Sequence, residues 1–172
     1  LRLREAMAAM GVGKTTLFFA WLVTFGLINL ITAAACTIAI STTFMPKSVW
    51  SLVFVLFFGF ALSTTALGAL LSSLFSKSRT AAIATPIVFF ACAIPSFALG
   101  PDADPQTLGR FFLLSPTAFS AGLKVMLDYE QVNGIGWHDL YNPNDAIPLG
   151  VCLATLFIDA ALYTLLTWYF DN

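Results

Sequence analysis

Residues 11–16 contain two glycines and the Gly-Lys-Thr sequence with which phosphate-binding loops end. A working loop of this kind has the form G-x-x-x-x-G-K-S/T and joins a strand to a helix whose N-terminus binds phosphate. Here Ala8 stands at the position of the first glycine, the preceding residues have a helical pattern, and the following ones are apolar enough to enter a membrane. We therefore interpret Gly13, Lys14 and Thr15 as a turn between a surface helix and a membrane span, not as a nucleotide site.

The other reactive side chains do not form a catalytic or metal-binding set. The single histidine, His138, has no candidate nucleophile in its segment. The three cysteines lie in apolar runs and lack the spacing of metal ligands or of a disulfide framework: Cys36, Cys92 and Cys152. We expect no catalysis and no bound metal in this chain, and the absence of a basic patch argues against nucleic-acid binding.

Asp159 is the side chain best suited to a function inside a membrane. It lies near the middle of the last apolar run, where a carboxylate costs at least about 2.5 kcal/mol on insertion scales and should face other helices or a wet cavity. Asn29 and Thr65 lie at comparable depth in their own runs, so either could share a hydrogen bond with it. Two interpretations stay open: a hydrogen-bonded anchor between helices, or a group for gating or for contact with a polar head group.

Small and polar residues follow stripes along the first two apolar runs. Helical spacing places two sets on one face each: Gly26, Asn29, Ala33 and Cys36, and then Ala61, Thr65, Gly68 and Ser72. Helices in lipid associate through close backbone approach and interhelical hydrogen bonds, which such stripes provide. The stripes predict helix packing or, alternatively, the polar lining of a substrate path. Ser63 joins Asn29, Thr65 and Asp159 as a candidate for either role.

The composition shows what kind of framework must position these side chains. Of the 172 residues 59% are hydrophobic and 10% are charged, whereas soluble domains carry about 25% charged residues. A run of about 20 apolar residues crosses a hydrocarbon layer about 30 Å thick. We predict an all-α polytopic membrane protein with four transmembrane helices, at 16–40, 49–75, 80–99 and 146–170. Pro86 and Pro95 should kink or end the third of them.

Two further regions lie outside the predicted spans. Residues 1–14 have the pattern of an amphipathic helix and a turn at the membrane surface. Residues 100–145 are acidic and rich in loops, and within them 108–130 predicts a helical hairpin that dips into one leaflet. Ser115 and Pro116 predict the start of its second helix, with serine as the cap and proline in the first turn.

The distribution of basic residues predicts the orientation. Lysine and arginine are enriched in the short cytoplasmic loops of membrane proteins. They precede the first span and follow the second: Arg2, Arg4, Lys14, Lys77 and Arg79. We therefore predict an integral, multi-pass chain whose two ends are both cytoplasmic, with residues 100–145 on the far side.

Several stretches together carry a family resemblance. They are LRLREAMAAMG at 1–11, the surroundings of FSKSRTAA within 61–82, LLSPTAFSAGLKVMLDYE at 113–130, and DAALYTLLTWYFDN at 159–172. In order and spacing these stretches resemble the transmembrane domain of the A subfamily of ABC transporters, the eukaryotic lipid-exporter type. The resemblance covers nearly the whole chain, which would then be one partial ABC-2 type transmembrane domain.

The resemblance implies a larger machine. These spans would be the last four of a six-helix half-transporter whose ATP-binding domain, using ATP and Mg²⁺, lies outside residues 1–172, so no cofactor is expected in this chain. The implied partners are membrane lipids, that nucleotide-binding domain and a second transmembrane domain on the same or another chain. The resemblance places the predicted hairpin in the outer leaflet. It also assigns the helix that couples to the ATPase, with Arg2, Arg4, Met7 and Met10.

The sequence is consistent with more than one function. The favoured hypothesis is the membrane-spanning part of an ATP-driven ABC transporter that moves lipids or other amphipathic substrates. The alternative is an ion-coupled carrier or channel that uses Asp159 and has no ATPase. An inactive remnant of a transporter gene is a third. The transported substrate, its direction and the membrane do not follow from the sequence.

Overall fold

The helices predicted from the apolar runs are present in the computed structural model, which describes residues 13–75, 78–98, 113–142 and 147–171. Within these ranges the regular elements are all helical, in the order α2 (Lys14–Thr43), α3 (Trp50–Leu74), α4 (Ser78–Ala98), α6 (Ser115–Val132), the 3-10 helix η1 (Trp137–Asp139) and α7 (Leu149–Asp171). The predicted all-α class is therefore confirmed.

The long helices match the thickness of a membrane. Three are long and apolar enough to cross one, over Thr16–Thr43, Trp50–Leu74 and Leu149–Phe170. The last of these helices has 22 residues. At a rise of about 1.5 Å per residue it is about 33 Å long, which is close to the hydrocarbon thickness of about 30 Å. The apolar part of α4, Arg79–Pro95, is shorter. A polytopic membrane protein is thus confirmed, and a complete crossing by α4 stays a prediction.

The end of α2 differs from the prediction. We predicted a turn from Ser41 onward, but α2 continues to Thr43. The Thr42 hydroxyl donates to the Ile38 carbonyl over 2.9 Å, so the polar side chain is satisfied inside the helix.

The prolines of α4 do not end it where they stand. Pro86 and Pro95 both lie inside the helix, which continues to Ala98. A proline removes one backbone donor, and helices in membranes tolerate that loss because neighbouring groups satisfy the freed carbonyl. Of the two predicted outcomes, a kink or an end, an end at Pro86 is therefore wrong, and a kink stays a prediction.

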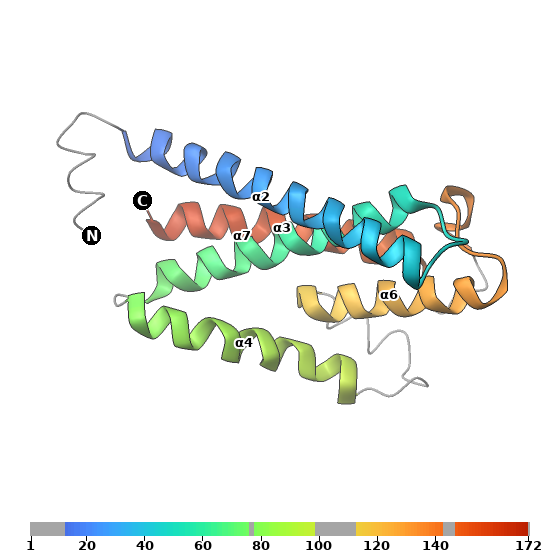
Figure 1. The fold of residues 1–172 in the computed structure, drawn as a ribbon. Helices are drawn as coiled ribbons and strands as arrows, with labels where there is room; N and C mark the ends of the chain where they lie inside the picture. The colour runs from blue at the N-terminus through green and yellow to red at the C-terminus, as the bar shows by residue number, and fades with distance from the viewer. Residues whose placement is uncertain (1–12, 76–77, 99–112, 143–146, 172) are drawn as a thin grey trace.

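The bundle is built around two neighbouring helices, α3 and α7 (Figure 1). Helix α2 packs along α3, whereas α6 packs against α3, α4 and α7. Figure 1 shows that α6 begins about halfway along α7 and ends at the same end of the bundle as the α2–α3 turn. Helix α6 therefore occupies one half of the length of the bundle, the placement expected of a segment that dips into one leaflet.

Two predicted elements lie outside the described residues. Residues 1–12 hold the predicted coupling helix with Arg2, Arg4, Met7 and Met10, and residues 99–112 hold the first part of the predicted hairpin. The second helix of that hairpin is α6, which runs to Val132, slightly beyond the predicted end at Glu130.

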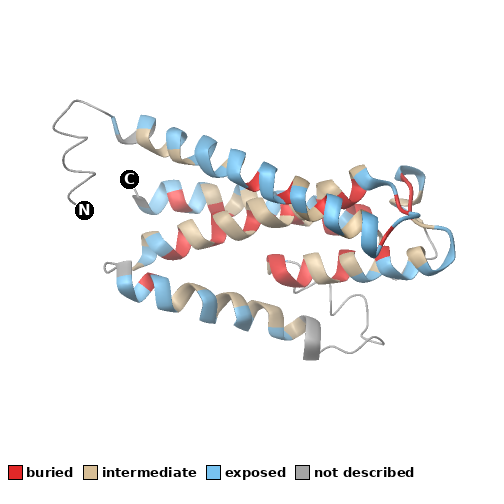
Figure 2. Cartoon of the chain, in the orientation of Figure 1, coloured by how far each residue is buried: buried red, intermediate tan, exposed pale blue. Residues whose placement is uncertain are grey.

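The core lies where α3, α6 and α7 face one another (Figure 2). Leu56, Met126 and Leu156, one from each of these helices, are all fully buried. A Cβ atom at Gly122 of α6 would lie only 3.0 Å from Cδ1 of Leu56, so a larger residue there would require the Leu56 side chain to shift.

Helices α2 and α4 are mostly exposed in Figure 2. Their exposed side chains include large apolar ones, among them Ile31, Ile38, Ile87 and Phe90. Outward apolar side chains of this kind are expected where hydrocarbon or further helices surround the bundle.

Candidate functional site

Asp159 is buried where α7 meets the start of α6. The residue is 1% exposed, and the Ser115 hydroxyl donates to its carboxylate Oδ2 over 3.4 Å. A hydrogen bond of that length is weak. The carboxylate nevertheless faces other helices, which is what the cost of placing it in hydrocarbon demands.

Ser115 does not cap its helix. It is the first residue of α6, Leu114 occupies the cap position, and there is no side-chain capping bond. The backbone N–H groups of Thr117 and Ala118 bond the carbonyl of Leu114 instead, over 2.8 and 3.3 Å. The predicted cap is therefore wrong, and the serine hydroxyl is directed at Asp159. Pro116 does lie in the first turn, as predicted.

Further hydrogen bonds fix the start of α6 at this depth. The Tyr163 hydroxyl of α7 donates to the carbonyl of Leu113 over 2.6 Å. The Thr117 hydroxyl donates to the carbonyl of Cys92 in α4 over 3.0 Å. Together with the contact between Ser115 and Asp159, these bonds tie the start of α6 to both α7 and α4.

Asn29 and Thr65 bond each other. The Asn29 amide Nδ2 donates to Thr65 Oγ1 over 2.9 Å, and this contact joins α2 to α3. The prediction that either residue would bond Asp159 is wrong, because α3 presents Thr65 to α2 while Asp159 faces α6. Ser63 is fully buried and donates to the carbonyl of Phe60 in its own helix over 3.0 Å. The assignment of these residues to helix packing or to a substrate path stays a prediction.

The buried face of α2 is narrower than the predicted stripe. Asn29, Ala33 and Thr37 are buried along it. At Gly26, by contrast, an added Cβ atom would meet nothing within 4 Å. The stripe therefore identified part of this contact face, but it ended at Cys36 and left out the buried Thr37.

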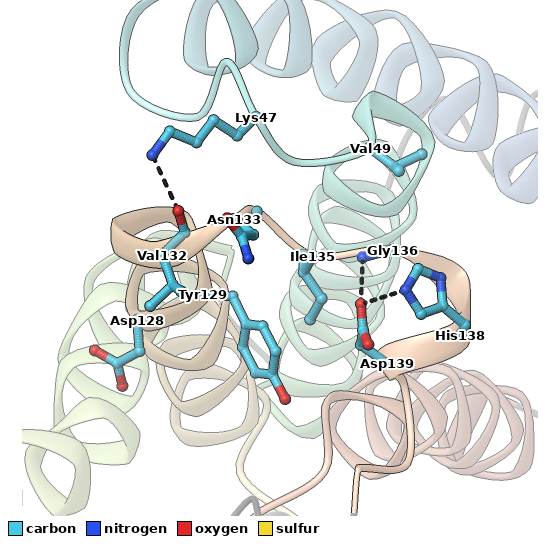
Figure 3. Close-up of a pocket in the computed structure, with 11 residues that line it drawn as sticks. Lys47, Val49, Asp128, Tyr129, Val132, Asn133, Ile135, Gly136, His138 and Asp139 are labelled. Atoms are coloured by element: carbon cyan, nitrogen blue, oxygen red, sulfur yellow. Dashed lines mark hydrogen bonds and ion pairs between the residues drawn. The ribbon is translucent and has the colours of Figure 1, made fainter.

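An open cleft lies at the end of the bundle where α2 turns into α3 and α6 ends (Figure 3). Its volume is about 580 Å³, within the range of about 300–1,000 Å³ common for ligand sites. Charged and aromatic side chains line it, among them Lys47, Asp128, Tyr129, His138 and Asp139. No sequence pattern predicted this cleft, because its walls come from segments that are far apart in the chain.

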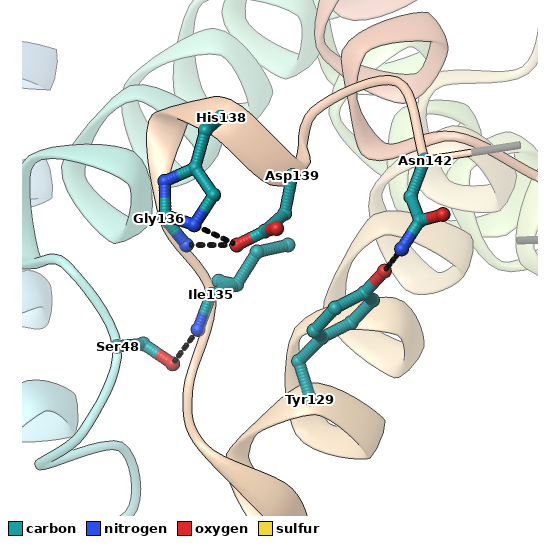
Figure 4. A network of polar contacts seen from close by, with 7 residues as sticks. All are labelled: Ser48, Tyr129, Ile135, Gly136, His138, Asp139 and Asn142. Atoms are coloured by element: carbon teal, nitrogen blue, oxygen red, sulfur yellow. Dashed lines mark hydrogen bonds and ion pairs between the residues drawn. The ribbon is translucent and has the colours of Figure 1, made fainter. Parts of the chain in front are cut away.

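A group of hydrogen bonds joins the α2–α3 turn to the end of α6 and is formed by residues 47–49 with Glu130 and Ile135. We call these residues, together with Gly134, which packs against the Lys47 backbone, the turn junction. The Glu130 carboxylate accepts the backbone N–H of Lys47 over 2.8 Å and also the hydroxyl of Ser48. The backbone N–H of Ile135 donates to the Ser48 hydroxyl over 3.3 Å (Figure 4). The backbone N–H of Val49 returns a bond to the Ile135 carbonyl over 3.0 Å.

Glu130 is charged at neutral pH in this setting. Partial burial raises the pKa of its carboxyl group, but the hydrogen bonds from Ser48 and from the Lys47 backbone, with the positive charge of Lys47, outweigh that effect. The net result is a pKa below the ordinary value of 4.5.

The opposite wall of the cleft is held by η1. Asp139 Oδ2 accepts the backbone N–H of Gly136 over 3.0 Å and lies 3.1 Å from His138 Nε2. The Asn142 amide donates to the Tyr129 hydroxyl over 2.8 Å (Figure 4). These contacts fix the position of the Asp139 carboxylate and of the Tyr129 ring at the cleft.

One sequence signal pointed toward this region. Asn133 and Gly134 follow the helical pattern of α6, and a glycine just after a helix commonly ends it in the left-handed conformation. Gly134 has φ 78°, and its N–H bonds the Tyr129 carbonyl over 2.9 Å. The helix end was therefore readable, whereas its partner in the α2–α3 turn was not.

Comparison with known proteins gives consistent matches along the chain. The family model described as ABC-2 family transporter protein matches residues 1–169. ATP-binding cassette sub-family A member 7 of Rattus norvegicus is 32% identical over 99% of this chain, which spans 8% of that protein. The glucosylceramide transporter ABCA12 of Mus musculus is 28% identical over 100% of the chain, which spans 7% of it. The phospholipid-transporting ATPase ABCA3 of Homo sapiens is 32% identical over 99% of the chain, which spans 11% of it.

Proposed function

Because this chain belongs to the ABC-2 family of transporter proteins and forms a transmembrane part of an ABC transporter, we propose that the complete protein moves lipids across the bilayer, driven by ATP. The observation that carries the proposal is the similarity along nearly the whole chain to relatives whose names specify phospholipid and glucosylceramide as their substrates. The amphipathic nature of such substrates suits a bundle whose outer faces are apolar and whose polar groups are buried or gathered at one end.

The proposal includes partners beyond the chain itself. A nucleotide-binding domain that uses ATP and Mg²⁺ would drive the cycle, and a second transmembrane domain would complete the path. Arg2, Arg4, Met7 and Met10 would lie on the cytoplasmic helix that receives the motion of the ATPase. Both ends of the chain would be cytoplasmic, in agreement with the positions of the basic residues.

The geometry around Asp159 favours this proposal over an ion-coupled carrier. A coupling carboxylate must exchange its ion with water during the cycle. Asp159 is 1% exposed and packed against the start of α6. An anchor between α7 and α6 suits this burial better than an ion-exchange site does.

The central test is reconstitution of the full-length protein into liposomes. We expect ATP to drive the movement of fluorescent phospholipid or glucosylceramide from one leaflet to the other, measured by the accessibility of the label to a membrane-impermeant quencher. A variant inactivated in the ATPase domain serves as the control. Equal lipid movement by the two proteins would contradict the proposed ATP-driven function.

The orientation can be tested separately. Single cysteines at Ser76 and at Asp102, in a background without the native cysteines, are labelled with an impermeant thiol reagent in sealed cells. We expect labelling from outside only at residue 102. Labelling of both positions from the same side would overturn the proposed topology.

A further inference from the structure

We propose that the first half of α2, residues 14–28, is a lipid-facing arm that bends away from the rest of the bundle in thin bilayers and toward it in thick ones. We call this segment the α2 arm. The proposal rests on the membrane spans alone and depends neither on ATP nor on the identity of the transported substrate.

The α2 arm is the least buried part of the helix. None of its described side chains is buried, and the first buried ones in α2 are Asn29, Ala33 and Thr37. Figure 1 shows the beginning of α2 apart from the end of α3, and Figure 2 shows exposed and half-buried residues along it. Its exposed side chains include the large apolar ones Phe19 and Val23. No helix in the described part of the chain therefore buries a side chain of the arm.

Helix α2 is also longer than the hydrocarbon layer requires. Its apolar span, Thr16–Thr43, has 28 residues and is about 42 Å long. The layer is about 30 Å thick, so about 12 Å of apolar helix is in excess. The span of α7, Leu149–Phe170, has 22 residues and fits the same layer with little tilt. An apolar excess of this size is accommodated when a helix tilts or bends, by an amount that depends on the thickness of the bilayer.

Aromatic residues locate the excess at the start of α2. Trp168 and Tyr169 lie at the end of α7, on the side of the bundle where α2 begins (Figure 1). Tryptophan and tyrosine concentrate at the depth of the head groups. The stretch from Trp21 to Thr43 is about 34 Å long, close to the length of α7. Phe19 precedes it and is 60% exposed, so α2 must lean to keep this ring in hydrocarbon.

The base of the arm is held at Asn29. The Asn29 amide Nδ2 donates to Thr65 Oγ1 over 2.9 Å, and Ala33 and Thr37 are buried beyond it. These contacts attach the second half of α2 to α3. We therefore expect the bend to begin near Asn29.

The arm can bend without a hinge. The Trp21 ring stacks on the Phe18 ring at a centroid distance of 6.3 Å and lies 4.8 Å from the Phe25 ring, so these side chains support one another along the helix. Long helices curve with a radius of about 60–100 Å while their backbone hydrogen bonds lengthen only slightly. Over an arm about 20 Å long, that curvature turns the helix by about 10–20° and displaces its end by about 2–3 Å.

The test measures one distance in the full-length transporter, in nanodiscs without ATP. A ketone-bearing phenylalanine analogue replaces Thr16 in the arm and Phe170 at the end of α7, and each ketone carries a spin label, so the native cysteines remain. The nanodiscs contain phosphatidylcholines with acyl chains of about 14, 18 or 22 carbons. We expect double electron–electron resonance to show the distance increasing by about 2–3 Å from the thickest to the thinnest bilayer, because the arm leans further outward.

A second label pair and two variants serve as controls. The pair Ile38 and Phe170 shares one site with the test pair but starts from the packed half of α2, so its distance should change by less than about 1 Å. Phe19→Lys places a charge in the arm that stays with the head groups, which shortens the apolar part and should at least halve the response of the Thr16 pair. Phe19→Leu keeps the apolar length and should keep the response. Because Phe19 is exposed, both variants should fold, and elution as a monodisperse transporter verifies this.

A consequence for regulation rests on the proposed function. Residues 1–12, to which we assign the coupling to the ATPase, directly precede the described part of the arm. The angle of the arm would then set where the motion of the ATPase enters the bundle. We expect the ATPase rate to vary more across the three bilayers in the wild type than in Phe19→Lys, and an equal variation in both would contradict this consequence.

Three results would overturn the proposed arm. One is a Thr16–Phe170 distance that stays the same in all three bilayers, which would show that other helices of the complete transporter hold the arm in place. Another is an equal change for the Ile38 pair, which would show that the whole bundle deforms. A third is an undiminished response in a folded Phe19→Lys variant. None of them would contradict ATP-driven lipid movement, which has its own assay.

Discussion

The turn junction and the mid-bundle polar contacts hold helices together in different ways. In the turn junction, backbone and side-chain hydrogen bonds converge on a short stretch, and several of them share Ser48 or Glu130. In the middle of the bundle, the contact of Asn29 with Thr65 and that of Ser115 with Asp159 each join one side chain of one helix to one side chain of another.

This difference follows from the solvent that each region meets. At the membrane surface, loops without regular structure must satisfy their own backbone groups, so polar contacts accumulate there. Between helices in hydrocarbon, the backbone is already satisfied and each polar side chain needs only one partner. We infer that the turn junction acts as a rigid fastening of the α2–α3 turn to α6. In a mid-bundle contact, by contrast, both partners can be replaced by apolar residues with little loss of stability. Four predictions test this contrast.

The largest effect is expected at Gly134 in the turn junction. Its φ of 78° is unfavourable for any residue with a Cβ atom, and that atom would lie 2.5 Å from the backbone carbonyl of Lys47. Backbone cannot move aside as a side-chain tip can, so Gly134→Ala should cost about 2–4 kcal/mol of unfolding free energy. Thermal unfolding of the purified transporter in nanodiscs measures the loss.

Gly26→Ala is the matched control for this substitution. An added Cβ atom there meets nothing within 4 Å, so the change should stay within about 0.5 kcal/mol. If the two alanine variants unfold at the same temperature, the turn junction is not the rigid fastening described here.

The second prediction concerns the buried carboxylate. Ser115→Ala removes the hydroxyl that donates to Asp159 and should cost about 1–2 kcal/mol, because the carboxylate then lacks that partner. The double variant Ser115→Ala with Asp159→Leu should recover most of the loss, since a buried polar pair replaced by apolar groups is often neutral. A double variant less stable than Ser115→Ala would show that Asp159 has further contacts.

Transport gives a second readout at the same position. Asp159→Asn and Asp159→Leu should be assayed for lipid movement and for assembly of the transporter. If both variants leave transport and assembly unchanged, Asp159 is neither an anchor between helices nor a functional group.

The sequence predicted some of these features and not others, for physical reasons. The apolar runs predicted α3 to within a residue at each end, because the length of an apolar helix must match the thickness of the hydrocarbon layer that it crosses. They also predicted that Asp159 faces other helices or a wet cavity, and it faces the start of α6. Depth in the membrane does not specify which face of a helix meets which neighbour, so Thr65 was assigned to the wrong partner. The bond of Ser48 with Glu130 joins residues 82 positions apart, and no local pattern encodes it.

The third prediction uses pH to weaken the turn junction. The pKa of Glu130 is lower in the folded protein than its ordinary value of 4.5, so the carboxylate contributes stability above that value and loses it as the pH falls through the folded pKa. Glu130→Gln should therefore be less stable than the wild type at pH 7, by about 1 kcal/mol or less because the group is close to water. The difference should shrink below about pH 4. A difference that is the same at pH 7 and pH 3.5 would show that packing, not charge, explains the effect.

The smallest effect is expected between α2 and α3. A double-mutant cycle of Asn29→Val and Thr65→Val, measured by thermal unfolding in nanodiscs, should give a coupling energy of about 0.6 kcal/mol, the average for hydrogen bonds between membrane helices. Thr24→Val is the matched control, because the Thr24 hydroxyl bonds the Ala20 carbonyl of its own helix and Thr24 should not couple to Thr65. An interaction of this strength is close to thermal energy, so moving α2 against α3 at this contact would need little free energy. Moving the α2–α3 turn away from α6 would instead break several hydrogen bonds at once. A coupling energy well above 2 kcal/mol would remove the contrast between the two regions and would identify the Asn29–Thr65 contact as a second rigid fastening.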